Sequence, residues 1–173
     1  MHAAAKIAIG ALAGLIVCGN AFAQSPTPEE RLKQAGITLR TPGAPPANRA
    51  NAVRTGNLLF VSGHTSQFAT KGKVGAQLTV EQGQQAARQS GINLLATVRA
   101  SLGSLDKVKR VVKVLGMVNA PEGFTDPPKV IDGFSDLMVE IFGDAGKSAR
   151  SAIGVQALPG NDPVEVEAIL EVE

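Results

Sequence analysis

"KSARSAIGVQALPGNDPVEVEAILEVE", residues 147–173, contains two stretches with the periodicity of strands, joined by the turn sequence Leu-Pro-Gly-Asn-Asp-Pro. In the second stretch, apolar residues recur at every other position: Val164, Val166, Ala168, Leu170 and Val172. This alternation places them on one face of a strand and Glu165 on the other. In the first stretch Arg150 alternates with Ala149 and Ser151, so we expect Arg150 on the face away from the core. The pair predicts a sheet whose outer face carries charged groups.

Three helices are predicted upstream from capping signals and apolar spacing. Residues 27–30 and 79–82 each form a capping box, and the first has Pro28 at the first helical position. A third helix is predicted to begin at Asp126. Glycines are predicted to end the three helices: Gly36, Gly103 and Gly143. The two longer helices each have a single apolar stripe, so we expect both to cover one face of a sheet.

The predicted strands complete the order of elements. A hairpin is predicted from residues 52–53 and 58–62 around a turn at 54–57, and residues 107–118 are predicted to form a further strand. The order is therefore hairpin, helix, strand, helix, strand, strand. It predicts one α+β domain with a sheet of four to five strands and with helices on one face.

The first 23 residues have the features of a secretory signal peptide. Lys6 precedes an apolar run at 7–17, and Ala21-Phe22-Ala23 is a small-x-small cleavage sequence. The run is shorter than the ~20 residues that a membrane span needs, and a lipoprotein signal at Cys18 is disfavoured by Val17. We therefore expect a mature chain that starts at Gln24, lies in the periplasm or is secreted, and has no membrane attachment. Residues 24–44 are expected to form a short helix and a Pro-rich lead, and residues 45–173 the domain.

Composition excludes several classes of function. Cleavage would remove Cys18, the chain's one cysteine, and with it any disulfide, thiolate metal site or cysteine nucleophile. The formal charge is only +2 and the chain has no Trp or Tyr, so we expect no nucleic-acid partner. His64 would be the one histidine left, and we interpret it as a polar residue at a strand end. "GDAGKS", 143–148, lacks the first glycine of a phosphate-binding loop and follows a helix. We expect no metal and no cofactor.

Three segments resemble the RidA family, also called YjgF or endoribonuclease L-PSP. They are "TGNLLFVSG" at 55–63, "VVKVLGMVNAPEGF" at 111–124 and "ARSAIGVQALPGNDPVEVEAI" at 149–169. The resemblance covers residues 45–173 and is greatest to the YjgF/chorismate mutase-like endoribonuclease branch. It implies a chorismate mutase-like fold with a mixed, mostly antiparallel sheet, and homotrimers with clefts between subunits. It also implies hydrolysis of enamines and imines, such as 2-aminoacrylate, to keto acids and ammonia.

The resemblance assigns site residues. Arg150 matches the arginine that binds a substrate carboxylate, which a guanidinium holds by two parallel hydrogen bonds. Glu165 matches the catalytic glutamate that positions a water, and Ser62 and Gly63 match a catalytic serine and a substrate-binding glycine at a strand end. The alternative for Arg150 is a structural salt bridge with a glutamate of a nearby strand.

Three positions depart from the deaminating members of that family. Arg49 stands in place of a tyrosine, Ala152 in place of a cysteine and Asp132 in place of an asparagine. Arg49 and Asp132, assigned to substrate binding, change the charge beside the pocket. The sequence therefore leaves three functions open: an enamine or imine hydrolase with a carboxylate-bearing substrate, a non-catalytic trimeric protein that binds small carboxylates, and, third, an endoribonuclease.

The turn near Gly160 makes the last two strands run in opposite directions. If they lie symmetrically about it, Arg150 is level with a residue near Glu171, about six residues from Glu165, or roughly 20 Å along the sheet. One small substrate cannot span that distance. We therefore predict that Arg150 of one subunit and Glu165 of its neighbour form each site.

Overall fold

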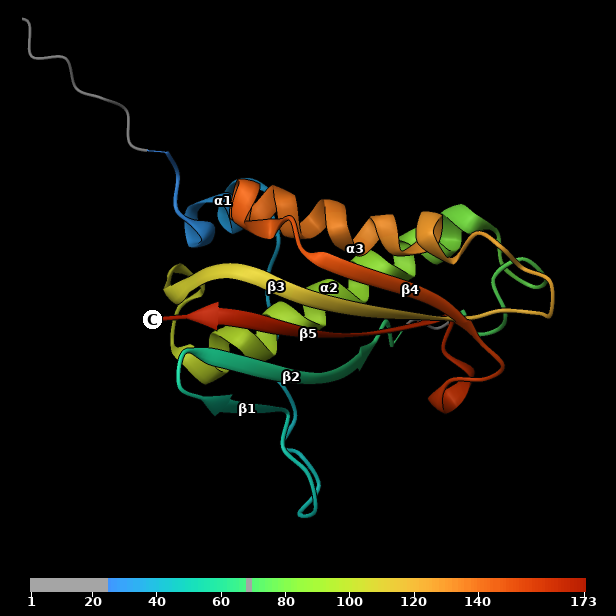
Figure 1. The fold of residues 1–173 in the computed structure, drawn as a ribbon, viewed down its shortest axis with the longest axis horizontal. Coiled ribbons are helices and arrows are strands. Elements are labelled where there is room, and N and C mark those ends of the chain that lie inside the picture. Colours follow the sequence, from blue (N-terminus) through green and yellow to red (C-terminus); the bar gives the residue numbers. More distant parts are fainter. Residues whose placement is uncertain (1–24, 68–69) are drawn as a thin grey trace, which may run out of the picture.

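The computed structural model describes residues 25–67 and 70–173, so the signal peptide expected at residues 1–23 lies outside the described residues. The elements follow the predicted order (Figure 1). The helices are α1 (Pro28–Gln34), α2 (Val80–Leu102) and α3 (Pro127–Phe142). The strands are β1 (Ala52–Thr55), β2 (Leu58–Thr65), β3 (Val108–Asn119), β4 (Ala149–Val155) and β5 (Val164–Val172). Among these residues, no helix is long and apolar enough to cross a membrane.

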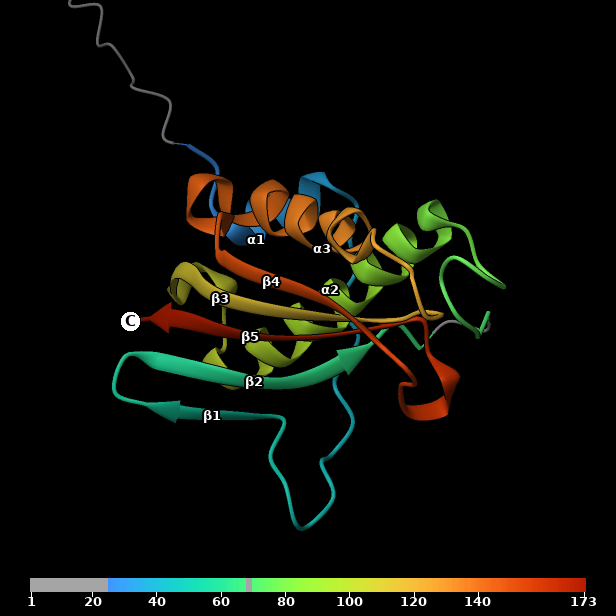
Figure 2. The same cartoon turned by 45° about the vertical axis from the view of Figure 1, so that its right-hand side comes forward.

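The five strands of the described residues form one sheet in the order β1-β2-β5-β3-β4. Only β3 and β4 pair in parallel, and the other neighbours are antiparallel. Helix α2 packs on β2 and β5, and α3 packs on β3 and β4, so one face of the sheet is covered (Figures 1 and 2). The predicted α+β domain, with a mixed, mostly antiparallel sheet and helices on one face, is confirmed.

Local sequence explains where the first two helices begin. Thr27 Oγ1 accepts a hydrogen bond from the Glu30 amide at 3.3 Å, and Glu30 Oε2 accepts one from the Thr27 amide at 2.9 Å. Thr79 and Gln82 make the same reciprocal pair at 3.2 and 2.9 Å. Both predicted capping boxes are therefore formed, and each satisfies amides that a helix start leaves unpaired. Helix α2 ends at Gly103, whose φ of 85° is in the left-handed region that favours glycine.

The start of α3 is fixed differently from the prediction. Asp126 is the N-cap residue, but its side chain makes no capping hydrogen bond. Its carboxylate instead pairs with Lys129 Nζ at 3.1 Å. Pro127, at the first helical position, has no amide hydrogen to satisfy and favours a helix start at that residue.

Helix α1 is attached to the domain through buried Leu32 and through Glu29. One oxygen of this carboxylate accepts a hydrogen bond from the Leu105 amide at 3.0 Å, and the other lies 3.5 Å from Arg99 Nη1. A hollow between α1 and α2 is lined in part by Ile37 and Leu39. Residues 37 and 39 of the lead thus pack against the core.

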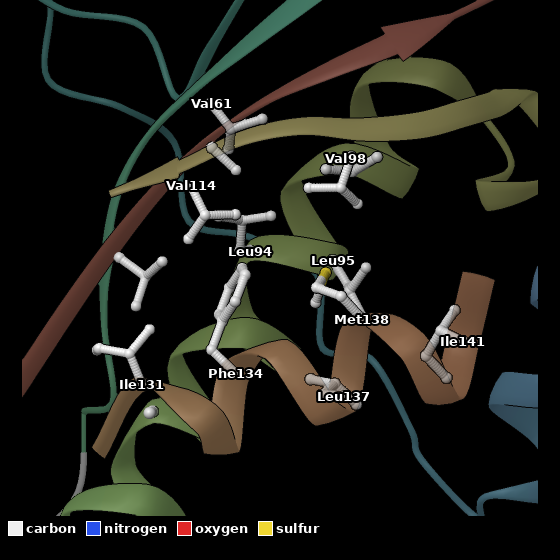
Figure 3. Packing of buried hydrophobic residues seen from close by; sticks show 14 of the residues in the cluster. Val61, Leu94, Leu95, Val98, Val114, Ile131, Phe134, Leu137, Met138 and Ile141 are labelled. Carbon is white, nitrogen blue, oxygen red and sulfur yellow. The ribbon is translucent and has the colours of Figure 1, made fainter. Parts of the chain in front are cut away.

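The core lies between the helices and the sheet. Phe134, fully buried, points from α3 toward Leu94 of α2 and Val114 of β3 (Figure 3). A fully buried side chain of this size contributes about 1.5–3 kcal/mol. The two long helices approach closely because Gly133 has no side chain: a Cβ there would lie 2.2 Å from the Gln84 carbonyl oxygen.

The other face of the sheet is open in the single chain. The pairing places Val53, Phe60 and Ile153 on this face, with exposed fractions of 57%, 41% and 45%. Glu165 and Glu167 of β5 lie on the same face, because the apolar residues that alternate with them are buried against the helices. This mixture of apolar and acidic groups will be called the open face.

Candidate functional site

Arg150 lies on edge strand β4 and points toward α3. Its Nη1 donates hydrogen bonds to Asp132 Oδ1 at 2.8 Å and to Ser135 Oγ at 2.9 Å. Asp132 and Ser135 are three residues apart on α3, and this spacing places them on one side of the helix. The structure therefore brings together two of the predicted substrate-binding residues, Arg150 and Asp132, and adds Ser135, which the sequence reasoning missed.

The face of β4 that carries Arg150 was predicted wrongly. Arg150 is level with Val114 of β3, which is level with Ala168 of β5, and both of these are buried under the helices. Arg150 thus extends from the helix-covered side of the sheet, at its edge, and the strand's open-face residues include Ser151. Arg150 forms a salt bridge with Asp132 of α3, not with the strand glutamate that was considered as the alternative.

A second group surrounds Glu165 on β5. Strand β2 has an irregular register between Val61 and His64, and the insertion brings Gly63 against Glu165. A Cβ on Gly63 would lie 2.0 Å from Glu165 Oε1, so only glycine leaves room for this carboxylate as it is placed. Gly63 and Glu165, both assigned to the site from the sequence, are thus neighbours in the structure.

Burial and charge both act on Glu165. Burial raises the pKa of this carboxyl above its ordinary value, and the negative charges of Glu167 and Asp162 raise it further, while Arg49 opposes them. No hydrogen bond to the Glu165 carboxylate occurs within residues 25–67 and 70–173. A partly buried carboxylate with a raised pKa is suited to accept and return a proton.

Ser62 and Arg49 lie in the segment that leads into this group. Ser62 Oγ donates a hydrogen bond to the Ala50 carbonyl at 2.7 Å, and this bond ties the segment before β1 to strand β2. The Arg49 amide donates to the Pro46 carbonyl at 3.2 Å, and the side chain is close enough to lower the pKa of Glu165. Arg49, Ser62, Gly63 and Glu165 therefore belong to one region of the chain's surface.

The two groups do not meet within one chain. Arg150 is level with Ala168, three residues along β5 from Glu165 and two strands away from it. At ~3.3 Å per residue and ~4.8 Å per strand, the Cα atoms are about 14 Å apart. The prediction that Arg150 is level with Glu171 was therefore wrong, and so was the separation of roughly 20 Å that followed from it. The two side chains also project from opposite faces of the sheet, so one small ligand cannot contact both in one chain.

Asp162 is a further residue that the sequence reasoning missed. It is 5% exposed, and it accepts hydrogen bonds from Ser66 Oγ at 2.8 Å and from Lys71 Nζ at 2.7 Å. These contacts anchor the chain just before β5, the strand that carries Glu165. Its position in the turn before Pro163 could have indicated such a role, since aspartate commonly anchors turns through its side chain.

His64 and the "GDAGKS" segment at 143–148 have structural rather than catalytic roles. His64 lies near the end of β2, where Nδ1 donates to the Ser62 carbonyl at 2.6 Å and Nε2 accepts from Thr97 Oγ1 at 2.8 Å. Burial lowers the pKa of His64, which favours this neutral form. Residues Gly143–Gly146 form a 3-10 turn directly after α3, as expected for a helix C-terminus. Within the described ranges, no group of three or more His, Cys, Asp or Glu side chains could hold a metal ion.

Comparison with known proteins places this arrangement in a family. Residues 29–171 match the family described as "YjgF/chorismate mutase-like, putative endoribonuclease". The chain belongs to the YjgF (RidA) family. The match begins within α1 and includes both groups of candidate residues.

Three individual proteins are similar to this chain over most of its length. "Protein TCP17" of Trypanosoma cruzi is 40% identical over 146 residues, which are 82% of this chain and 91% of the relative. A 2-iminobutanoate/2-iminopropanoate deaminase of Dermatophagoides farinae is 34% identical over 125 residues, covering 72% and 85% of the two chains. The crystal structure of Atu1372 from Agrobacterium tumefaciens, a protein of unknown function, has a TM-score of 0.78 at 38% identity and covers 84% and 92%.

Proposed function

We propose that this YjgF-family protein hydrolyses a reactive enamine or imine that carries a carboxylate, at a site formed by two subunits. The observation that carries the proposal is the division of the polar residues into two groups on opposite faces of one sheet. Each group has only part of the chemistry: Arg150 can bind a carboxylate, and Glu165 can activate a water. The relative named as an iminobutanoate/iminopropanoate deaminase supports the reaction class.

The chemistry requires one water and no external oxidant or reductant. In its iminium form the substrate R–C(=NH₂⁺)–CO₂⁻ reacts with H₂O to give R–C(=O)–CO₂⁻ and NH₄⁺. Glu165 takes a proton from the water as the water oxygen bonds to the imine carbon, and returns this proton to the nitrogen. As the carbon–nitrogen bond breaks, the remaining hydroxyl proton also passes to the nitrogen, which leaves as NH₄⁺. Arg150 holds the substrate carboxylate by two hydrogen bonds, and Gly63 leaves the space in which Glu165 is placed.

The assembly that would complete the site is a trimer of this chain. The open face carries exposed Val53, Phe60 and Ile153, which would be buried if further copies packed against it. Because β4 is an edge strand, a neighbouring copy can approach Arg150 from the side of the sheet. Light scattering is expected to give three chains per particle at micromolar concentration, and a stable monomer or dimer would contradict the trimer.

Mixing two inactive variants tests the shared site. Arg150→Ala and Glu165→Ala proteins are each expected to release no ammonia above background from enamines generated in situ. If they are dissociated, mixed in equal amounts and reassembled, about a quarter of the sites should combine an intact Arg150 with a neighbour's intact Glu165. Mass spectrometry of the mixed trimers controls for exchange. No recovery of ammonia release or carboxylate binding in exchanged trimers would show that the site is not shared.

The alternative function is a trimeric protein that binds a small carboxylate without turnover. The ion pair between Arg150 and Asp132 favours it, because half of the guanidinium is already engaged. Ammonia release equal in the wild type and in Arg150→Ala, together with carboxylate binding only in the wild type, would establish this alternative. Cleavage of RNA is a third function, suggested by the family's description.

We also propose that the protein is exported. The proposal rests on Lys6, the apolar run at 7–17 and the Ala21-Phe22-Ala23 sequence. Mass spectrometry of the protein from its native cell envelope should find Gln24 at the N-terminus. An intact Met1 would contradict export by this route.

A further inference from the structure

The ion pair on α3 and β4 uses one end of the Arg150 guanidinium and leaves the other free. Nη1 has two N–H groups, and both are engaged, one by Asp132 Oδ1 and one by Ser135 Oγ. Within residues 25–67 and 70–173, Nη2 and Nε make no hydrogen bond. Nη2 and Nε form the edge of a guanidinium that holds a carboxylate by two parallel hydrogen bonds. The edge suited to a carboxylate is therefore open, although the arginine is paired.

Asp132 places a negative charge beside this open edge. Its side chain is 50% exposed, against 24% for Arg150, and Oδ2 makes no hydrogen bond in the described part of the chain. A simple anion on Nη2 and Nε would lie a few ångströms from this carboxylate and would be repelled by it. A ligand that also carries a positive group next to its carboxylate would instead be attracted by Asp132.

We infer that Arg150 and Asp132 together select a zwitterionic ligand. The ligand carboxylate binds Nη2 and Nε of Arg150, and an α-iminium or α-ammonium nitrogen binds Asp132 Oδ2. This inference rests on the proposed function for the placement of Arg150 in the substrate site. It identifies the protonated imine, rather than the enamine or a simple carboxylate, as the form that the site binds. The keto acid product has lost the positive group, so the same pair favours its release.

Two ligands of matched carbon skeleton test this selection. L-Alanine and propanoate differ by the α-ammonium group, and their dissociation constants can be measured by NMR titration of the assembled protein. The wild type is expected to bind L-alanine more tightly than propanoate. In Asp132→Asn, which keeps an oxygen for Nη1 but removes the charge, this preference should fall on the order of tenfold, as expected for one unit charge a few ångströms away.

Asp136→Asn provides the matched control. Asp136 is an exposed residue of the same helix, one turn further on, and its substitution removes the same charge. The preference for L-alanine in this variant should stay within about twofold of the wild type, since the high dielectric constant of water weakens the effect of an exposed charge that does not contact the ligand. Arg150→Gln should lose both ligands, which would place their binding at this residue.

Several outcomes would overturn the inference. A preference that Asp132→Asn leaves unchanged, even with a lowered melting temperature, would mean that the pair only holds β4 to α3. A wild type that prefers propanoate, or that binds neither ligand, would also contradict it. Ammonia release, measured separately, distinguishes failure of this inference from failure of the proposed function. If the wild type prefers L-alanine and Asp132→Asn weakens that preference, but no ammonia is released, only hydrolysis is excluded. If ammonia is released normally but Asp132→Asn leaves the preference as it is in the wild type, only zwitterion selection is excluded.

Discussion

Replacing Gly63 with alanine tests the placement of Glu165 with one methyl group. The new Cβ would lie 2.0 Å from Glu165 Oε1, 2.9 Å from Cδ and 3.1 Å from Cγ. Ordinary contact between non-bonded atoms lies near 3.5 Å, so Oε1 has to move by about 1.5 Å. A displacement of about 1 Å in a reacting group can cost on the order of 100-fold in rate. We therefore expect Gly63→Ala to reduce ammonia release about 100-fold.

The same substitution should have little effect on folding. The atoms that must move are the end of a flexible side chain, and a side-chain torsion held about 30° away from its preferred rotamer costs about 0.5–1.5 kcal/mol. Gly63 does not have a left-handed φ, so alanine fits its backbone and stabilises the fold by about 0.4–1 kcal/mol through the unfolded chain. The two effects nearly cancel, and the free energy of unfolding should change by no more than about 1 kcal/mol.

Gly43→Ala is the matched control, because a Cβ there has no neighbour within 4 Å and its φ is not left-handed. Both variants would be compared with the wild type in the ammonia-release assay and in urea denaturation. The control should keep full activity. Activity of Gly63→Ala within twofold of the wild type would refute the assignment of Glu165 in its observed position. A loss of stability above about 2 kcal/mol would refute the argument that only the side chain moves.

Three further predictions concern charge and packing. Because burial and then Glu167 raise the pKa of Glu165, ammonia release should fall on acidification with a midpoint above the ordinary 4.5, and Glu167→Gln should move that midpoint down in a pH–rate profile. Gly133→Ala forces a methyl against helix backbone, so urea denaturation should show a loss of about 2 kcal/mol or more despite the better helix propensity of alanine. The lowered pKa of His64 means that the folded state binds fewer protons than the unfolded state, so stability should fall as pH drops below about 6.5, and His64→Gln should remove this slope.

Much of the fold could be predicted because its signals are local. Capping boxes, glycines at helix ends and apolar stripes each depend on a few neighbouring residues, and the two capping boxes were formed as the sequence indicated. The alternation on β5 also correctly identified which of its residues face the core. Asp126 shows the limit even here, because a capping residue was recognised while its side chain found a competing partner in Lys129.

The register between strands could not be predicted in the same way. A symmetrical turn would put Arg150 level with Glu171, whereas β3 lies between the two strands and the observed level is Ala168. The difference is three residues, an odd number, and an odd shift moves a side chain to the other face of a sheet. The predicted level with Glu171 therefore agreed with the predicted face of Arg150, and both were wrong, although the face was derived separately from the alternation of Arg150 with Ala149 and Ser151. The contact of Gly63 with Glu165 depends on the extra residue between Val61 and His64 in β2, which no residue pattern predicted.

The central position of β5 has a consequence for how the chain folds. The hairpin of β1 and β2 and the parallel pair of β3 and β4 share no backbone hydrogen bonds, since β5 lies between them and pairs with both. Until residues 164–172 are in place, a nascent chain can hold only two separate fragments of sheet. The domain is therefore expected to form late and all at once, when its last strand inserts and joins two halves that are far apart in sequence.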